Sequence, residues 1–293
     1  MTPLPHIQVF QSLHSSPNSR LEHCAELGDG MVAALWSNHH DAQQYQAPSH
    51  HTLSCYIAGG TGTHRRERPE HNGAPDKLCT LPAGHDSAWV VNGDIRLAHL
   101  YFDPQHFALS CVRLLDREPR TLQLQEHTFL DDPQQALRFR QLISLNWAEP
   151  AERLLTSSLA HAMLDHTVLT QVGIRGDLQL KGGLAPHQRR HVIEYIEAHL
   201  AEALTLGQLA AQCNLSEYHF ARMFRVSLGI APHQYVLACR LGRARQLLRH
   251  TALPLGDIAL ACGFASASHF TNRFRQALGA TPGDYRRVFR TVQ

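Results

Sequence analysis

The sequence lacks any long apolar run and any recognisable export signal. No stretch of about 18 apolar residues occurs in its 293 residues, which predicts no transmembrane helix and no membrane partner. Residues Met1 to His6 contain no basic stretch followed by an apolar one, so we expect no secretory signal. The seven cysteines never form a Cys-x-x-Cys pair, which argues against a disulfide framework. These absences together predict a cytoplasmic protein with reduced, mostly buried thiols.

Lysine is nearly missing from the C-terminal part of the chain, although that part is basic. Residues 181–293 hold 14 Lys and Arg against 6 Asp and Glu, a net charge of +8, and Lys181 is their sole lysine. Residues 1–180 carry a net charge of −6. This polarity predicts an anionic partner for the C-terminal part, with double-stranded DNA as the leading candidate and a solvated basic face as the alternative.

The basic part contains an internal repeat. Residues 205–236 read TLGQLAAQCNLSEYHFARMFRVSLGIAPHQYV, and residues 254–286 read PLGDIALACGFASASHFTNRFRQALGATPGDYR. The first halves match at an offset of 49 and the second halves at an offset of 50, so the second copy carries one inserted residue. Two copies indicate a duplicated supersecondary unit.

Each copy has the pattern of a helix, a tight turn and a second helix. The turn falls on Asn214 in the first copy and on Gly263 in the second, and both residue types tolerate a left-handed backbone conformation. Ser216 and Ser266 are good N-caps for the second helix. Paired phenylalanines four residues apart should pack inward and leave the opposite face exposed. These phenylalanines are Phe220 and Phe224 in the first copy, and Phe270 and Phe274 in the second.

A long helix is expected between the two copies, from Pro232 to about His250. At about 1.5 Å per residue it spans roughly 27 Å. It can therefore hold two groove-reading helices about one DNA turn, or roughly 34 Å, apart.

Residues 186–290 resemble the DNA-binding domain of AraC/XylS-type transcription regulators. The most specific segments lie in the second copy. They are Asp257-Ile258-Ala259, Gly263-Phe264, His269-Phe270, Arg273-Phe274, Gly279-Ala280-Thr281-Pro282 and Tyr285-Arg286. The resemblance implies a seven-helix domain whose two helix-turn-helix units enter successive major grooves, with reading helices at about 216–226 and 266–276.

Individual side chains of the reading helices receive expected roles. The candidates for base contacts are Tyr218, Arg222, Ser268, His269 and Asn272. Arg222 can place two donors on guanine O6 and N7, with a phosphate contact as its alternative role. His269 also belongs to the family's structural His-Phe pair, so packing is its alternative. The candidates for phosphate contacts, with a solvated side chain as the alternative, are Arg225, Arg240, Arg273, Arg275 and Arg286.

The acidic part reads as short strands followed by two helices. The expected strands are residues 32–36, 53–57, 78–81, 88–91 and 96–102, with a hairpin turn at Asn92-Gly93-Asp94. Asp132 before Pro133 caps the first helix, and the second begins after Pro150. This order, with the stretch Leu81-Pro82-Ala83-Gly84-His85, resembles the family's cupin-like effector domain and its dimerisation helices. The candidates for dimer contacts are Leu155, Leu159, Ala162 and Met163.

Metal chemistry is disfavoured in the acidic part, although it holds 15 of the 22 histidines. His50 and His51 are adjacent, and neighbouring strand residues point to opposite faces, so both cannot enter one barrel site. No G-x-S-x-G, P-loop or dinucleotide fingerprint is present. We therefore expect no metal, no cofactor and no enzyme activity. The candidates for an effector pocket are His50, His85, Trp89 and Tyr101, with core packing as their alternative role.

The sequence predicts an α+β protein of two domains. Residues 1–170 form a β-rich, cupin-like effector and dimerisation domain, with a barrel at about 1–125 and a helical pair at about 131–170. Residues 171–186 form a linker, and residues 187–293 form an all-α DNA-binding domain. The expected protein is a homodimeric transcription regulator that contacts DNA and RNA polymerase and responds to a small molecule. Two alternatives are a metal-binding cupin sensor or enzyme fused to a DNA-binding domain, and a purely architectural DNA binder.

Overall fold

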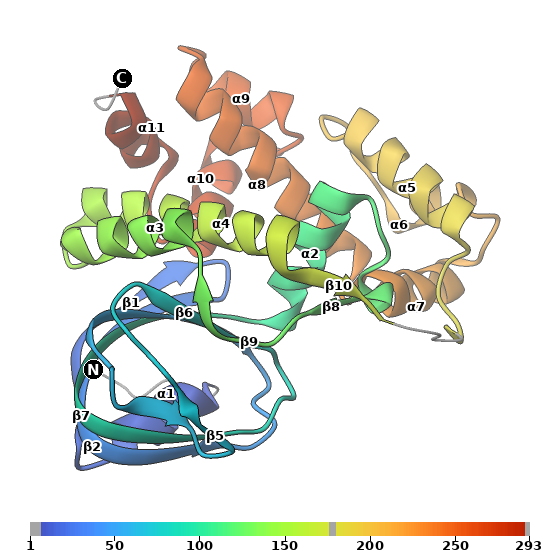
Figure 1. The fold of residues 1–293 in the computed structure, drawn as a ribbon. Coiled ribbons are helices and arrows are strands. Elements are labelled where there is room, and N and C mark those ends of the chain that lie inside the picture. The colour runs from blue at the N-terminus through green and yellow to red at the C-terminus, as the bar shows by residue number, and fades with distance from the viewer. Residues whose placement is uncertain (1–6, 176–179, 291–293) are drawn as a thin grey trace. The chain divides into compact units, whose positions relative to one another are not determined.

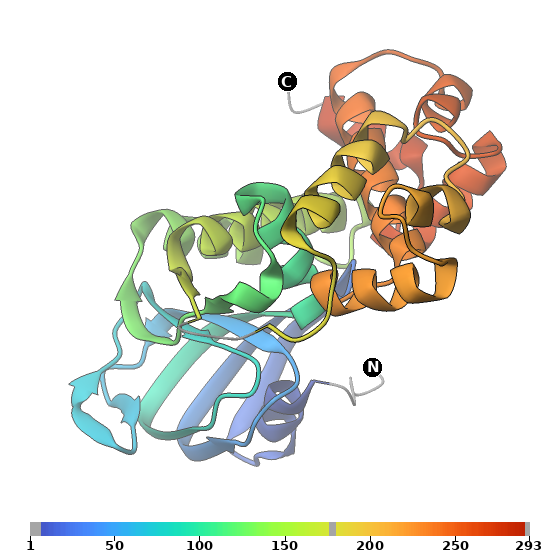
Figure 2. The same cartoon turned by 90° about the vertical axis from the view of Figure 1, so that its right-hand side faces the viewer.

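The structure is a computed structural model that describes residues 7–175 and 180–290 (Figures 1 and 2). It divides into two compact units. The first comprises the chain up to Phe107 together with Leu124–Val172, and the second comprises Ala108–Gln123 together with the chain from Gly173 onward. The expected domain boundaries, at residues 170 and 187, stay a prediction. The structure differs in one segment, because residues 108–123 group with the second unit, whereas the prediction placed them in the first domain. Residues 176–179 of the expected linker lie outside the described residues.

The first unit is built on an eight-stranded antiparallel sheet. Its strands are β1 (Ser19–Gly28), β2 (Met31–Tyr45), β3 (His51–Gly59), β4 (Thr63–Arg65), β5 (Arg68–Asn72), β6 (Lys77–Leu81), β7 (Ser87–Phe102) and β9 (His127–Asp131). The main path runs β1-β2-β7-β3-β6-β9, and β4 pairs with both β5 and β7. Figure 1 shows these strands curling around a common interior. The sheet confirms the expected strand-rich N-terminal region.

The expected hairpin at Asn92-Gly93-Asp94 is wrong, because β7 continues through these residues as one strand. Its partner β2 pairs with it on both sides, as Asn38 with Ile95 and Asp41 with Val91, and the register shifts between these two pairs. Gly93 has a φ of 105°, which an L side chain rarely adopts. The turn-like residues therefore form a bulge within a long strand.

The interior of the sheet is apolar and aromatic. Trp36 and Tyr101 are at most 1% exposed, and the ring of Phe10 meets Trp36 edge-on at a centroid distance of 5.0 Å. Phe10 belongs to α1 (Gln8–Ser15), which the sequence did not predict. Figure 2 shows this blue N-terminal helix lying against the strands.

Further elements complete the middle of the chain. They are α2 (Pro104–Leu115), η1 (Pro119–Thr121), β8 (Leu122–Leu124), α3 (Pro133–Ser144), α4 (Pro150–Gln171) and β10 (Val172–Ile174). The expected cap on α3 is confirmed, because the Asp132 carboxylate accepts a hydrogen bond from the Gln135 N–H at 2.9 Å. The unpredicted helix α2 begins with the same signal, since Asp103 precedes Pro104 and accepts from the His106 N–H at 2.8 Å.

The second unit is helical, as expected. Its helices beyond residue 180 are α5 (Pro186–Ala198), α6 (Leu206–Ala211), α7 (Glu217–Leu228), α8 (Pro232–His250), α9 (Leu255–Ala261), α10 (Ala267–Leu278) and α11 (Pro282–Arg290). In Figure 2 these yellow-to-red helices gather into one bundle. The strand-rich first unit and the helical second unit confirm the α+β fold class.

Candidate nucleic-acid interface and effector cavity

The two predicted helix-turn-helix units are α6–α7 and α9–α10. Their corners lie where the sequence placed them, with Asn214 at a φ of 54° and Gly263 at a φ of 73°. A Cβ atom on Gly263 would lie 2.1 Å from the Leu200 carbonyl oxygen, so this corner requires glycine for space as well as for conformation. Asparagine suffices at the first corner because its short polar side chain tolerates the left-handed region.

Both second helices begin and end in the same way. The Ser216 hydroxyl accepts from the His219 N–H at 3.4 Å, and the Ser266 hydroxyl accepts from the His269 N–H at 3.1 Å. Each helix ends at a glycine with positive φ, Gly229 after α7 and Gly279 after α10. The two helices therefore have the same length and the same caps, which supports one role for both.

The paired phenylalanines pack on the inner faces of α7 and α10, as predicted. Phe220, Phe224, Phe270 and Phe274 are all fully buried. Both pairs have ring centroids 5.5 Å apart. The aromatic contact continues to Tyr235 in the first unit and to Tyr285 in the second, at 5.7 and 5.4 Å. The repeat in the sequence is thus a repeat in packing, and it fixes which face of each helix is left outward.

The outward faces carry every candidate for a base contact. Tyr218, Arg222, Ser268, His269 and Asn272 are all exposed, and the Tyr218 side chain is 80% exposed. The His269 ring also meets the Phe264 ring edge-on at 5.7 Å. Its backbone N–H is held by the Ser266 cap, so His269 combines an exposed position with a structural contact. The base contacts of all five side chains stay predictions.

The candidates for phosphate contacts divide into two groups. Arg225, Arg273 and Arg275 are exposed on α7 and α10. The Arg240 guanidinium instead donates to the carbonyl oxygens of Leu200 and Glu202, at 3.0 and 2.6 Å. Arg286 likewise donates to the Leu253 carbonyl oxygen at 2.5 Å.

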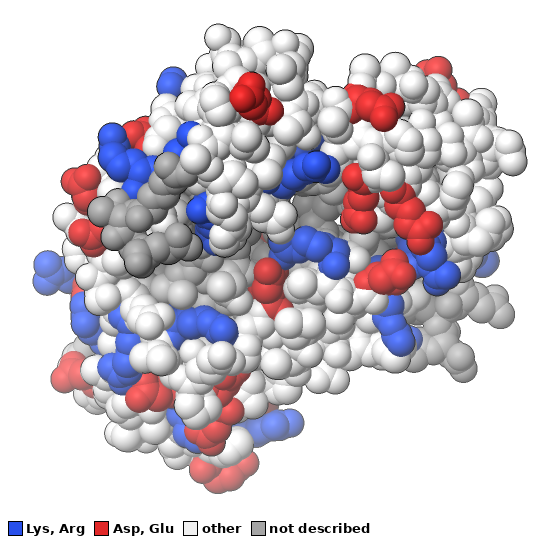
Figure 3. Space-filling view, turned by 90° about the horizontal axis from the view of Figure 1, so that it is seen from above, with Lys and Arg blue, Asp and Glu red and all other residues white. Residues whose placement is uncertain are grey.

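Arg240 and Arg286 therefore fix loops of the second unit. The three exposed arginines are the stronger candidates for phosphate contacts. On the face in Figure 3, Lys and Arg side chains are interspersed with Asp and Glu and form no single basic patch.

The second unit also contains a buried ion pair that sequence reasoning missed. Glu118 and Arg189 are 7% and 5% exposed, and an Arg189 Nη1 to Glu118 Oε2 distance of 3.8 Å joins them. Arg120 also pairs with Glu118 and donates to the carbonyl oxygens of Lys181 and Gly182. Val112 of α2 joins the same apolar cluster as Phe220 and Phe224. Segment 108–123 is therefore part of the core around the first helix-turn-helix unit.

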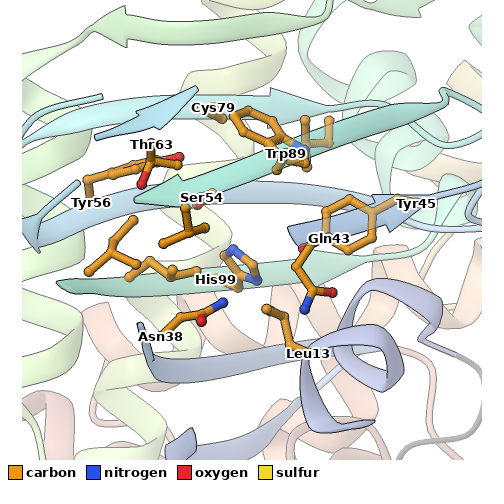
Figure 4. Close-up of a pocket in the computed structure, with 14 residues that line it drawn as sticks. Leu13, Asn38, Gln43, Tyr45, Ser54, Tyr56, Thr63, Cys79, Trp89 and His99 are labelled. Carbon is orange, nitrogen blue, oxygen red and sulfur yellow. The ribbon is translucent and has the colours of Figure 1, made fainter. Parts of the chain in front are cut away.

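A cavity of about 40 Å³ lies among the strands of the first unit (Figure 4). Its lining residues are Leu13, Asn38, Gln43, Tyr45, Ser54, Tyr56, Thr63, Cys79, Leu81, Trp89, Val91, Ile95, Leu97 and His99. Of the four candidates for an effector pocket, Trp89 alone is in this set. In Figure 4 the labelled side chains come from several strands and from the N-terminal helix.

The other three pocket candidates lie elsewhere. Tyr101 is buried next to His99, and its hydroxyl lies 2.8 Å from His99 Nδ1. His50 is buried, and its Nδ1 lies 3.1 Å from the side-chain oxygen of Gln8. The His85 side chain is 52% exposed, and its Nδ1 lies 3.0 Å from Oε2 of Glu126. It directly follows Gly84, whose φ is 82°. His85 is thus misplaced by the sequence prediction.

Burial keeps two histidines of this region, His51 and His99, neutral. It lowers the pKa of His99 to about 3 and the pKa of His51 to about 4, because a charged ring would lose its hydration. Within the described ranges, no group of three or more His, Cys, Asp or Glu side chains is arranged to hold a metal ion.

The candidates for dimer contacts do not all lie on an accessible face of α4. Leu155 and Leu159 are half-buried and Ala162 is exposed, whereas Met163 is fully buried within the first unit. The prediction that Met163 makes a surface contact is therefore wrong. Met163 lies one position along the helix from Ala162, which places its side chain to the side of the outward stripe formed by Leu155, Leu159 and Ala162. Leu169, 60% exposed, extends that stripe.

Comparisons with known proteins match both units. Residues 34–164 match the AraC-like ligand binding domain family, and residues 209–288 match a helix-turn-helix domain family. The chain is 40% identical over 91 residues to the probable transcriptional regulator LumQ of Photobacterium leiognathi, covering 31% of this chain and 37% of LumQ. It is 26% identical over 262 residues to the transcriptional activator RhaS of Escherichia fergusonii, covering 86% of this chain and 88% of RhaS. The chain thus spans less than half the length of LumQ but most of RhaS.

A comparison with solved structures gives partial matches. One of these is the DNA-binding domain of AdpA in complex with a target DNA, which is 31% identical and covers 36% of this chain and 96% of that chain, with a TM-score of 0.35. Among the helices of residues 7–175 and 180–290, none is long and apolar enough to cross a membrane.

Proposed function

We propose that this chain is a transcriptional regulator of the AraC/XylS family, which binds a specific DNA site and controls transcription from it. The observation that carries the proposal is the duplication of one reading helix. The helices α7 and α10 share their caps, their buried phenylalanines and an outward face of polar side chains. Two such faces in one unit fit two stretches of major groove.

The remaining parts of the proposal concern partners and control. A second copy of the chain binds through the outward stripe of α4, which Leu155, Leu159, Ala162 and Leu169 form. A small molecule binds in the first unit and changes DNA binding. The protein acts in the cytoplasm, contacts RNA polymerase at its target site and catalyses no reaction.

Selection of bound DNA from a random library, with the full-length protein at about 0.15 M salt, tests this function. The expected result is a motif of two short blocks about 10–10.5 bp apart, which reports two grooves read on one face of the duplex. A doubled motif reports the dimer. If no sequence is enriched, binding is non-specific and the architectural alternative replaces the regulator.

Arg222→Ala is expected to weaken binding to the selected site by about 1–3 kcal/mol and to relax base preference at one position. The exposed guanidinium on α7 has the reach and the paired donors that guanine O6 and N7 require. Titration of the selected site and of its single-base variants measures both effects. An equal loss for every sequence would assign Arg222 to a phosphate.

Arg275→Ala is expected to weaken binding to all sequences alike. Arg275 is exposed in the last turn of α10, away from the capped end that carries Ser268 and His269. One lost phosphate contact lowers the slope of log affinity against log salt by about 1. Titrations at several salt concentrations measure this slope, and a selective loss for one base pair would contradict the assigned role.

A further inference from the structure

We propose that the cavity of the first unit binds a small uncharged molecule that carries a hydroxyl group, of the class of short-chain alcohols. The inference rests on the proposed function, in which this unit responds to an effector. Three properties of the cavity carry it: the absence of charge in its lining, the unpaired polar atoms that it contains, and its size.

The lining is uncharged. None of its fourteen residues is Asp, Glu, Lys or Arg. The nearby Asp41 carboxylate is already engaged, because it accepts hydrogen bonds from Ser16, Asn38, Gln43 and the Ala42 N–H at 2.6–2.8 Å. The Arg65 guanidinium, which lies over the Trp89 ring, is engaged by Glu67 and Glu126. An ionic ligand would lose its hydration in the cavity without gaining a partner of opposite charge.

Two buried oxygen atoms of the lining have no hydrogen-bond partner. They are Oδ1 of Asn38 and Oγ1 of Thr63, in side chains of residues that are 4% and 3% exposed. Buried polar atoms are rarely left unpaired, because an unmade hydrogen bond costs free energy. Both atoms can accept a hydrogen bond, so they favour a ligand that donates one.

His99 supplies a donor on the same surface. The Trp36 indole N–H can only donate, and it donates to the Tyr101 hydroxyl at 3.2 Å. Among the hydrogen bonds of the described residues, His99 Nδ1 is the one atom placed to accept the hydrogen of that hydroxyl, at 2.8 Å. We therefore assign the proton of the neutral His99 ring to Nε2, which makes this nitrogen a donor. A hydroxyl group both donates and accepts, so one such group satisfies either kind of partner.

The size of the cavity limits the ligand to a few atoms. A volume of about 40 Å³ has room for about three to four water-sized groups, since one requires about 10–15 Å³. The rings of Tyr56 and Trp89 and the side chain of Leu97 offer apolar contact to a short carbon chain. A ligand of four heavy atoms binds at best with a dissociation constant of about 40 µM.

The test uses three probes of equal carbon count and different charge: propan-1-ol, propionate and propylammonium. The full-length protein is titrated with each, and tryptophan fluorescence reports occupancy because Trp89 lines the cavity. The expected result is saturable binding of propan-1-ol alone. Equal or tighter binding of either ion overturns the inference, and so does the absence of propan-1-ol binding up to about 100 mM, about 2,500 times the best attainable dissociation constant.

A matched pair of variants places the binding in this cavity. Thr63→Val removes the unpaired hydroxyl that lines it and is expected to weaken propan-1-ol binding about tenfold. Thr52→Val removes a hydroxyl that is equally buried and unpaired but lies outside the lining, so it is expected to leave binding unchanged. Neither change removes a hydrogen bond of the folded protein, so both variants are expected to fold. Equal effects of the two variants on binding overturn the inference.

The outcome is independent of the DNA experiment. A selected DNA motif without propan-1-ol binding rejects the ligand class and leaves the regulator in place. Propan-1-ol binding without a DNA motif rejects the regulator and leaves the ligand site in place.

Discussion

Glu118→Ala is expected to lower the free energy of unfolding of the second unit by about 3–5 kcal/mol, the cost of removing one partner of a buried ion pair. The Arg189 guanidinium is 5% exposed and would keep only the hydrogen bond from its Nη2 to the Asp116 carbonyl oxygen, at 3.3 Å. Its Nε has no hydrogen-bond partner in the described structure. Such a loss is a large part of the 5–15 kcal/mol that holds a typical domain folded.

Urea unfolding followed by far-ultraviolet circular dichroism measures this change, and hydrogen exchange locates it. Exchange is expected to rise in α5 and α7, beside segment 108–123, and to stay unchanged in α10. The control is Asp116→Asn, in the same segment. Asp116 pairs with Arg190 at 3.6 Å, but both side chains are about 60% exposed, so the change should cost under about 1 kcal/mol. Asparagine also suits the φ of 48° at this position. If the two variants lose equal stability, burial of the Glu118 pair contributes nothing.

Phe274→Ala is expected to lower the free energy of unfolding by about 3–5 kcal/mol, through the second helix-turn-helix unit. The ring is fully buried between Phe270 and Tyr285, at centroid distances of 5.5 and 5.4 Å. Its removal leaves a cavity that the capped helix α10 cannot fill by a small shift. The reading face of α10 would lose its fixed position, and we expect the variant to select only one block of the DNA motif.

Two comparisons make this prediction specific. Phe274→Leu keeps most of the apolar volume and should cost under about 1.5 kcal/mol. Phe224→Ala, at the equivalent position of the first unit, should instead remove the other block of the motif. Hydrogen exchange that rises equally in α7 and α10 after Phe274→Ala would show that the two units unfold together and would contradict separate reading heads.

The DNA-reading part could be predicted from the sequence because its signals are local. The turn residues Asn214 and Gly263, the caps Ser216 and Ser266, and the paired phenylalanines each act within about one helical turn. Because the unit is duplicated, each of these signals occurs twice in the sequence. A pattern that arose by chance in one copy would not recur in the other. The same kind of local signal, an Asp before a Pro, marks α2 at Asp103 and Pro104 as it marks α3 at Asp132 and Pro133.

The first unit was harder to predict because its strands depend on distant partners. Asn92-Gly93-Asp94 has the composition of a hairpin turn, but β2 pairs with the chain on both sides of it and makes it a bulge. Whether His85 or His99 lines the cavity is set in the same way. Both are histidines in or next to strands, and the pairing of β7 directs His99 inward while the turn at Gly84 leaves His85 beside Glu126.

The sequence by itself determined the two helix-turn-helix units, their outward faces and the charge of the part that carries them. Helical periodicity and capping are short-range properties that a chain shows before it folds. Tertiary structure alone decided that segment 108–123 joins the core of the second unit, that Arg240 and Arg286 fix loops, and that the cavity lining is uncharged. Each of these depends on contacts between residues more than 30 positions apart. Such contacts form only when the whole chain has packed, because burial brings together side chains that no local spacing relates.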